Sequence, residues 1–286
     1  LIVQDHLAEL EWQAGHGPDF APGSGERDTW NDIVLRGRLR NAVRNLNPDV
    51  PEEYLDQAIG EVITPKSQSA IAENRRIHQI LVEGYRGIEY IDHEGNVQNP
   101  TIYFLSSQPH KNDYLSLNQV TVANLDGERR FDVVCYVNGM PLAFIELKKT
   151  GANTSVEGAH NQLQTYVKEF GMAFRFANIV IPSDDLSAKY GTPFTPWNHF
   201  APWNVDEDGS PVDPNNMVVA GEPVTQLDLL LDGLFNVERF GQLYSDFTAF
   251  DDTAEGLVMR IAKPHQYFAV TKACLLYTSP SPRDRQ

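Results

Sequence analysis

Residues 131–149, with the sequence FDVVCYVNGMPLAFIELKK, contain two acids and a lysine that could together hydrolyse a phosphodiester. Asp132 opens the first apolar run, and Glu146 and Lys148 close the second. Two carboxylates that converge on one point suit Mg²⁺, which proteins bind through one or two carboxylates plus substrate phosphate and water. The metal polarises a phosphodiester and lowers the pKa of an attacking water. A neighbouring lysine can orient that water or offset the charge on phosphorus.

The pattern around these residues predicts that they meet. Asn138-Gly139 is a strong signal for a two-residue hairpin turn. Depending on the loop length, Asp132 lies opposite residue 145 or residue 147, which is one position from Glu146 in either register. Glu146 and Lys148 are two residues apart and therefore emerge on the same face of their strand. We expect the three side chains to gather at the open end of one hairpin.

Ordinary surface charges are the alternative interpretation, because Glu-x-Lys is common at the ends of exposed strands. Two features weigh against it. The run LAFIELKK is too apolar for an exposed strand, and the partner acid Asp132 is in register.

Length and composition are those of a globular protein with a substantial core. The chain has 286 residues, 41% of them hydrophobic and 22% charged, which allows one large domain or two smaller ones. The sequence shows neither an apolar run long enough to span a membrane nor a signal-peptide pattern. Two cysteines do not make a disulfide framework, so a cytoplasmic location is expected.

The net charge of −16 argues against a free-standing nucleic-acid binder, because phosphate contacts require lysine and arginine. Basic residues cluster visibly in one segment, at Arg36, Arg38, Arg40 and Arg44. Three of them recur every four residues and predict a stripe on a helix. A solvated helix face and a DNA contact are equally compatible with that stripe.

Hydrophobic periodicity predicts helices first, then strands, then further helices. Helices are expected over 1–13, 29–46, from Pro51 onward and over 71–84, and strand-like runs follow up to residue 149. A helix over 156–170 and a buried strand within 176–184 complete an α/β domain with a mixed sheet. Residues 203–224 are acidic and rich in Pro and Gly, as in a linker, and helical patterning resumes from 224 to 273.

The pattern of Asp132 followed by Glu146-x-Lys148 resembles that of the PD-(D/E)xK nucleases. The chain as a whole resembles the N-terminal part of the restriction subunit of type I restriction-modification enzymes. This resemblance extends over nearly all of residues 1–273 and includes the segments LRGRLRNAVRNLNPDVPEEYLDQAI, NDYLSLNQVTV, RRFDVVCYVNGMPLAFIELKK, NQLQTYVKEF and HQYFAVTKA. It implies a restriction-endonuclease-like core, a mixed β-sheet flanked by helices, in which Asp132, Glu146 and Lys148 carry cleavage and the two acids bind Mg²⁺. Phe131 stands where that family usually has Pro.

Further site residues are implied by the same resemblance. Gln162 and Tyr166 match a Gln-x-x-x-Tyr motif on the helix after the catalytic strand, and their spacing places them on one helical face. Gln266 matches the glutamine motif before a helicase-like ATPase motor, where it would read the adenine of ATP. A Gly-x-x-x-x-Gly-Lys phosphate loop does not follow it in this sequence. An additional acid present in some members is expected to lie before Leu1.

The implied function is that of a Mg²⁺-dependent endonuclease module of an ATP-dependent type I restriction enzyme, which cuts double-stranded DNA after translocation. The modification (methyltransferase) and specificity subunits would hold the DNA, which accounts for an acidic nuclease. One alternative is a PD-(D/E)xK nuclease of another helicase-nuclease defence or repair system. Another is a non-cleaving domain that docks a subunit or binds DNA.

Four segments are expected along the chain. Residues 1–202 form the endonuclease domain, truncated at its N-terminus; 203–260 form a linker and helices leading to the motor; and 261–273 begin that motor. Residues 274–286 resemble a translated sequencing adapter, so Leu275, Leu276 and Tyr277 are expected to pack against nothing.

Overall fold

A computed structural model describes residues 2–125, 127–148, 155–184, 186–219 and 222–278. Its α-helices are α1 (Ile2–Glu9), α2 (Arg36–Leu46), α3 (Glu52–Ile63), α4 (Ala70–Glu83), α5 (Val156–Glu169), α6 (Gln226–Phe235), α7 (Val237–Ser245) and α8 (Pro264–Thr278). Its strands are β1 (Gln13–His16), β2 (Tyr90–Ile91), β3 (Val97–Gln98), β4 (Tyr114–Asn124), β5 (Gly127–Val137), β6 (Met140–Leu147), β7 (Ile179–Ser183), β8 (Val218–Val219), β9 (Glu222–Pro223), β10 (Thr248–Thr253) and β11 (Gly256–Ile261). Short 3₁₀ turns include η1 (Gly17–Phe20), η2 (Pro109–Lys111), η3 (Gly171–Phe176), η4 (Trp197–His199) and η5 (Pro214–Asn216).

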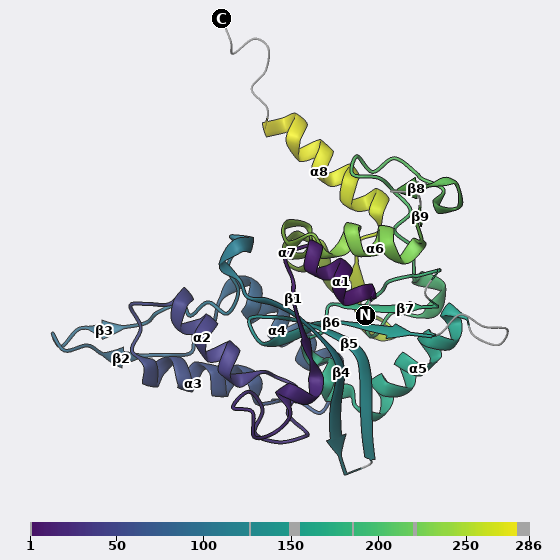
Figure 1. The fold of residues 1–286 in the computed structure, drawn as a ribbon. Coiled ribbons are helices and arrows are strands. Elements are labelled where there is room, and N and C mark those ends of the chain that lie inside the picture. The colour runs from purple at the N-terminus through teal and green to yellow at the C-terminus, as the bar shows by residue number, and fades with distance from the viewer. Residues whose placement is uncertain (1, 126, 149–154, 185, 220–221, 279–286) are drawn as a thin grey trace, which may run out of the picture.

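A five-stranded mixed sheet forms the centre of the molecule, in the order β1-β4-β5-β6-β7 (Figure 1). The three inner strands β4, β5 and β6 run antiparallel to one another. Both edge strands, β1 and β7, pair in parallel with their neighbours. This confirms the expected α/β class with a mixed sheet flanked by helices.

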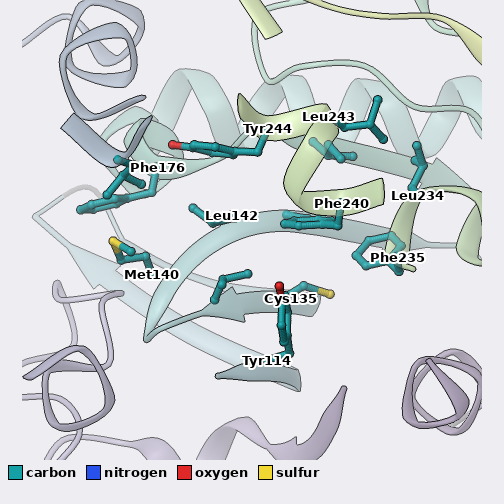
Figure 2. Packing of buried hydrophobic residues seen from close by; sticks show 14 of the residues in the cluster. Tyr114, Cys135, Met140, Leu142, Phe176, Leu234, Phe235, Phe240, Leu243 and Tyr244 are labelled. Atoms are coloured by element: carbon teal, nitrogen blue, oxygen red, sulfur yellow. The ribbon is translucent and has the colours of Figure 1, made fainter. Parts of the chain in front are cut away.

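Apolar clusters cover both faces of this sheet. On one face Val133, Cys135 and Val137 of β5 join residues of α1, α6 and α7. Figure 2 shows part of this cluster, with Leu142 and Cys135 facing Phe240 and Tyr244 of α7. On the other face Val134, Tyr136 and Phe144 pack against α5 and η3. Burial on two sides explains why β6 reads as a continuous apolar run rather than an alternating one.

The helix expected over 29–46 begins only at Arg36, so that prediction is wrong at its N-terminal end. The buried guanidinium of Arg27 donates hydrogen bonds to the carbonyl oxygens of Asp32 (2.5 Å), Trp30 (3.1 Å) and Thr121 (2.9 Å). Those carbonyls are therefore satisfied without a helix. The N–H of Leu35 likewise donates to the carbonyl oxygen of Gly139, at 2.9 Å.

Two other helical predictions are also corrected. The first helix ends at Glu9, and Gln13–His16 forms an edge strand parallel to β4. Trp12 ends the helical pattern because its indole is buried and donates to the carbonyl oxygen of Phe235, at 2.8 Å. The stretch expected to continue as helix contains the β10–β11 hairpin instead. Among the described residues, every helix is too short or too polar to cross a membrane.

The arginine stripe of α2 is neutralised by carboxylates. Each arginine forms an ion pair, and the pairs are Arg36 with Asp28 (3.3 Å) and Asp32, Arg38 with Asp113 (2.7 Å), Arg40 with Asp56 (2.7 Å), and Arg44 with Glu52 (2.8 Å). Of the two interpretations of the stripe, these pairs favour the structural one over a DNA contact.

Candidate active site

The hairpin that holds the candidate residues turns where the sequence predicts. Asn138 and Gly139 have φ values of 52° and 78°, and the turn closes on the pair Val137↔Met140. These left-handed conformations fit a two-residue type I′ turn.

A bulge in β6 then decides which residues face each other. Tyr136 pairs with Pro141, but Cys135 pairs with Ala143, so Leu142 is one extra residue in β6. Beyond the bulge Val133 pairs with Ile145, and continuing this register places Asp132 directly across from Glu146. The structure therefore brings the two acids into the predicted proximity, in a register that lies between the two predicted ones.

Asp132 is fixed between its two neighbouring strands. One of its oxygens, Oδ2, accepts a hydrogen bond from the backbone N–H of Leu147, at 2.9 Å. On the β4 side, the facing position is Gln119, whose φ of 52° is left-handed. Regular pairing holds on both sides of this point, at Asn118↔Val133 and Val120↔Phe131. Sequence reasoning missed Gln119, since a positive φ at a non-glycine residue leaves no signal in the sequence.

Glu146 is a buried acid, with a side chain only 2% exposed. Burial raises the pKa of the Glu146 carboxyl, the nearby Asp132 raises it further, and Lys148 lowers it, giving a pKa of about 8. The ammonium Nζ of Lys148 lies 3.6 Å from Glu146 Oε1. The two acids thus repel each other when both are ionised, and a single lysine offsets part of that repulsion.

The helix α5 supplies the remaining two candidates. Ser155 caps this helix by accepting a hydrogen bond from the N–H of Gly158, at 3.1 Å. Lys148 donates a hydrogen bond to the side-chain carbonyl of Gln162, and the amide of Gln162 donates to the hydroxyl of Tyr166. A continuous chain of contacts therefore runs from Glu146 through Lys148 to α5.

Packing holds the Tyr166 ring in place at the far end of that chain. Its centroid lies 5.5 Å from that of Phe131 in an edge-on contact. Burial, followed by the charge of Glu146, raises the pKa of the Tyr166 hydroxyl. Tyr166 is thus neutral at ordinary pH and can act as a hydrogen-bond partner for Gln162.

This donor set fits a hard divalent cation with few protein ligands. Within the described ranges, the structure has no group of three or more His, Cys, Asp or Glu side chains arranged to hold a metal. In the described part of the chain, Asp132 and Glu146 are the carboxylates that would hold such a cation, and water and substrate phosphate could add further ligands, as is usual for Mg²⁺.

Gln266 belongs to a different part of the fold from the Asp132–Glu146 cluster. It lies in the first turn of α8, where its side-chain oxygen accepts a hydrogen bond from the backbone N–H of Lys263, at 2.8 Å. The side chain is otherwise exposed. Its adenine-binding role stays a prediction.

Fold and site together define an α/β protein whose central sheet carries an acid pair and a lysine at the point where the β5–β6 pairing ends. Residues 1–199 match the family model of the type I restriction enzyme R protein N terminus, and the chain belongs to this family. It is similar to the type I restriction enzyme HindI endonuclease subunit of Haemophilus influenzae, with 28% identity over 279 residues, covering 95% of this chain and 26% of that protein.

Two further relatives have comparable names. A Methanocaldococcus jannaschii protein that bears the name of the MjaIXP endonuclease subunit is also 28% identical over 279 residues, covering 93% of this chain and 26% of its own length. The type I restriction enzyme EcoprrI endonuclease subunit of Escherichia coli is 26% identical over 166 residues, covering 56% of this chain and 50% of that protein. The chain thus spans about a quarter of the length of the first two relatives.

Proposed function

We propose that this chain is the Mg²⁺-dependent endonuclease module of an ATP-dependent type I restriction enzyme, which hydrolyses phosphodiester bonds of double-stranded DNA after translocation. The observation that carries the proposal is the meeting of Asp132, Glu146 and Lys148 at one end of a buried hairpin. The names of the relatives, which are endonuclease subunits of type I restriction enzymes, support the same class of reaction.

In this proposal Asp132 and Glu146 hold Mg²⁺. The bound cation supplies polarisation of the phosphodiester and a lowered pKa for the attacking water. The hydrogen bond from the Leu147 N–H keeps the Asp132 carboxylate in place, so that it would be positioned to hold the cation. Glu146, with a pKa of about 8, would have to release its proton to hold the cation.

Lys148 acts in this proposal as a positioned positive charge. Its contact with Gln162 fixes the side chain, and its ammonium lies 3.6 Å from the Glu146 carboxylate. From there it orients the attacking water or offsets the negative charge that develops on the phosphate. Gln162 and Tyr166 support the site through Lys148 and do not themselves touch the reacting atoms.

The wider assembly follows from the resemblance to type I enzymes. The modification and specificity subunits hold the double-stranded DNA, and an ATP-driven motor, in which Gln266 reads adenine, moves it toward the nuclease. A module that receives DNA from its partners does not need to bind DNA tightly, which is consistent with a net charge of −16.

Single substitutions in the reconstituted enzyme, with the full-length restriction subunit and its partner subunits, test this function. We expect Glu146→Gln and Lys148→Ala to abolish DNA cutting while ATP-driven translocation continues, because the motor is a separate unit. Glu94→Gln is the matched control, since Glu94 lies on the exposed β2–β3 turn. Full cutting by either site variant would contradict the proposal.

The strongly acidic charge favours a second candidate, a domain that docks a subunit without cutting DNA. Nicking of plasmid DNA by this chain in the presence of Mg²⁺ or Mn²⁺ separates the two candidates. Metal-dependent nicking that is lost in Glu146→Gln supports the nuclease. Normal assembly of an enzyme that carries this substitution and still cuts DNA would support the docking role.

A further inference from the structure

Lys189 lies on the same cross-strand row as the candidate active site. Glu146 of β6 pairs with Pro182 of β7. The next segment, residues 188–191, runs antiparallel to β7, and the N–H of Lys189 donates to the carbonyl oxygen of Pro182, at 3.3 Å. Two strand spacings, or about 10 Å, therefore separate the backbone of Lys189 from that of Glu146.

The side chains of Lys189 and Glu146 also face the same layer of the fold. Glu146 contacts Lys148, which is bound by Gln162 of α5. The Lys189 ammonium lies 4.5 Å from the centre of the Trp197 ring. That ring is in turn 4.9 Å from the imidazole of His160, also on α5. Both residues are therefore on the α5 side of the sheet.

A second lysine lies close to the first. Lys263, just before α8, donates a hydrogen bond from its ammonium to the carbonyl oxygen of His199 in η4, the turn that also carries Trp197. The two ammonium groups therefore contact the same three-residue turn, Lys189 at Trp197 and Lys263 at His199. Burial lowers the pKa of Lys263, and the charge of Lys189 lowers it further. Neither lysine forms an ion pair with a carboxylate in the described part of the chain, unlike the arginines of α2.

Two adjacent ammonium groups repel each other when no carboxylate is near. An anion that lies between them replaces this repulsion with attraction. They are notable in a chain whose net charge is −16. We propose that Lys189 and Lys263 bind the phosphodiester backbone of DNA beside the candidate active site and align the strand that reaches Glu146. This inference rests on the proposed nuclease function for its choice of anion.

DNA binding by the 286-residue chain in EDTA tests the pair without any cleavage. The measurement is fluorescence anisotropy of a labelled duplex, with salt varied from about 20 to 200 mM. We expect Lys189→Gln and Lys263→Gln each to weaken binding and to reduce the slope of log K against log salt by about 1, because each removes one phosphate contact. Lys189→Arg should retain the slope.

The matched control is Lys111→Gln, which removes the same charge from an exposed residue of η2. An equal effect of Lys111→Gln would mean that only net charge matters, and would overturn the proposal. Unchanged slopes in both site variants, or no measurable DNA binding by the unmodified chain at the lowest salt, would overturn it as well. Thermal unfolding of each variant separates lost binding from lost folding.

A second measurement needs no substitution. DNA should protect Lys189 and Lys263 from acetylation while Lys111 stays reactive, as read by mass spectrometry. Protection by inorganic tripolyphosphate but not by DNA would assign the pair to a nucleotide and overturn the proposal. These readouts do not depend on cutting. If Lys189→Gln loses DNA binding while Glu146→Gln still cuts DNA fully, the DNA-binding role of the two lysines stands and the proposed nuclease function is rejected.

Discussion

At the scale of single residues, Glu146 is where stability and the proposed chemistry conflict. A buried carboxyl next to Asp132 is costly to ionise, and only Lys148 among its described neighbours offsets that cost. A site arranged only for stability would replace such a group with an apolar side chain. A cation that binds both acids would remove the repulsion, so the unfavourable arrangement is consistent with a metal site.

The first prediction concerns the pH dependence of stability in EDTA. The pKa of Glu146 is about 8 in the folded protein and near 4.5 when unfolded, so the folded state holds its proton more tightly. The free energy of unfolding should therefore fall as pH rises from about 4.5 to 8. Glu146→Gln removes this loss and should stabilise the protein at pH 8 by a few kcal/mol.

Urea unfolding of both proteins at pH 5 and pH 8 measures this effect. The two should have similar stability at pH 5, where Glu146 is largely protonated in the folded protein, and should separate at pH 8. Asp184→Asn, at a half-buried position outside the cluster, is the control and should show no comparable separation. A Glu146→Gln protein that is less stable than the unmodified chain at pH 8 would contradict the assigned pKa.

The second prediction concerns Gln162, the residue that positions Lys148. Gln162→Ala should slow single-turnover cleavage in the reconstituted enzyme by on the order of 10- to 100-fold, because Lys148 keeps its charge but loses its anchor. Tyr166→Phe should have a smaller effect, since it removes only the hydroxyl that contacts Gln162. Gln164→Ala on the same helix is the control, because Gln164 contacts the carbonyl oxygen of Pro193 instead.

At the scale of elements, the hairpin β5–β6 was predictable in its turn but not in its register. The Asn138-Gly139 signal predicted the place of the turn and left the loop length open, and the structure has the two-residue turn. The extra residue Leu142 in β6, which brings Asp132 opposite Glu146, could not be read from the sequence, because Leu142 is one apolar residue in an apolar run. Its side chain packs in the cluster with Cys135 and Val137, so tertiary packing accounts for the bulge.

For the helices too, the sequence predicted local features but not those set by long-range contacts. The spacing of Gln162 and Tyr166 correctly predicted one face of a helix, and the helix expected over 71–84 is present as α4. The helix expected to begin at residue 29 begins only at Arg36. The reason is that the Arg27 side chain donates hydrogen bonds to the backbone carbonyls of Trp30 and Asp32, which therefore need no helical partner. Local propensity cannot predict a long-range contact of that kind.

The third prediction concerns the turn that sets the hairpin. Gly139 has φ 78°, and a Cβ there would collide with the carbonyl oxygen of Leu35 and lie 2.7 Å from the N of Leu39. Gly139→Ala should therefore destabilise the protein by about 3 kcal/mol or more, as backbone strain adds to the clash. Denaturant unfolding measures the loss.

Gly95 provides the matched control for this substitution. It has a similar φ of 88°, in the β2–β3 turn, but a Cβ there meets no atom within 4 Å. Gly95→Ala should cost only the strain of a left-handed alanine, about 1 kcal/mol. Equal losses at the two positions would show that the contact between the hairpin turn and α2 does not constrain the turn.

At the scale of the whole molecule, an acidic chain places its positive charge unevenly. The arginines of α2 are paired with acids, whereas Lys148, Lys189 and Lys263 lie on or beside the row that contains Glu146. Lys189 and Lys263 are thus two cations beside the candidate active site for which the described residues supply no carboxylate partner. The segment limits expected at residues 202, 260 and 273 stay predictions, and α6 and α7 contribute to the same apolar cluster as the sheet.

The last prediction concerns the C-terminal segment 274–286. The expectation that Leu275, Leu276 and Tyr277 pack against nothing lies outside the side chains that the structure describes. Within the described part, α8 is anchored by its first turns. Tyr267 and Phe268 are buried, and the Tyr267 hydroxyl donates to the side-chain oxygen of Gln242, at 2.5 Å. Lys272, Ala273 and Cys274 are exposed.

Removing residues 274–286 should therefore change the free energy of unfolding by no more than about 0.5 kcal/mol, as for exposed positions elsewhere. Phe268→Ala is the contrasting variant and should cost about 3–5 kcal/mol, because it empties a buried site. Thermal and urea unfolding of the three proteins give the comparison. A deletion that costs as much as Phe268→Ala would mean that this segment packs on the fold, and that its sequence belongs with the rest of the chain.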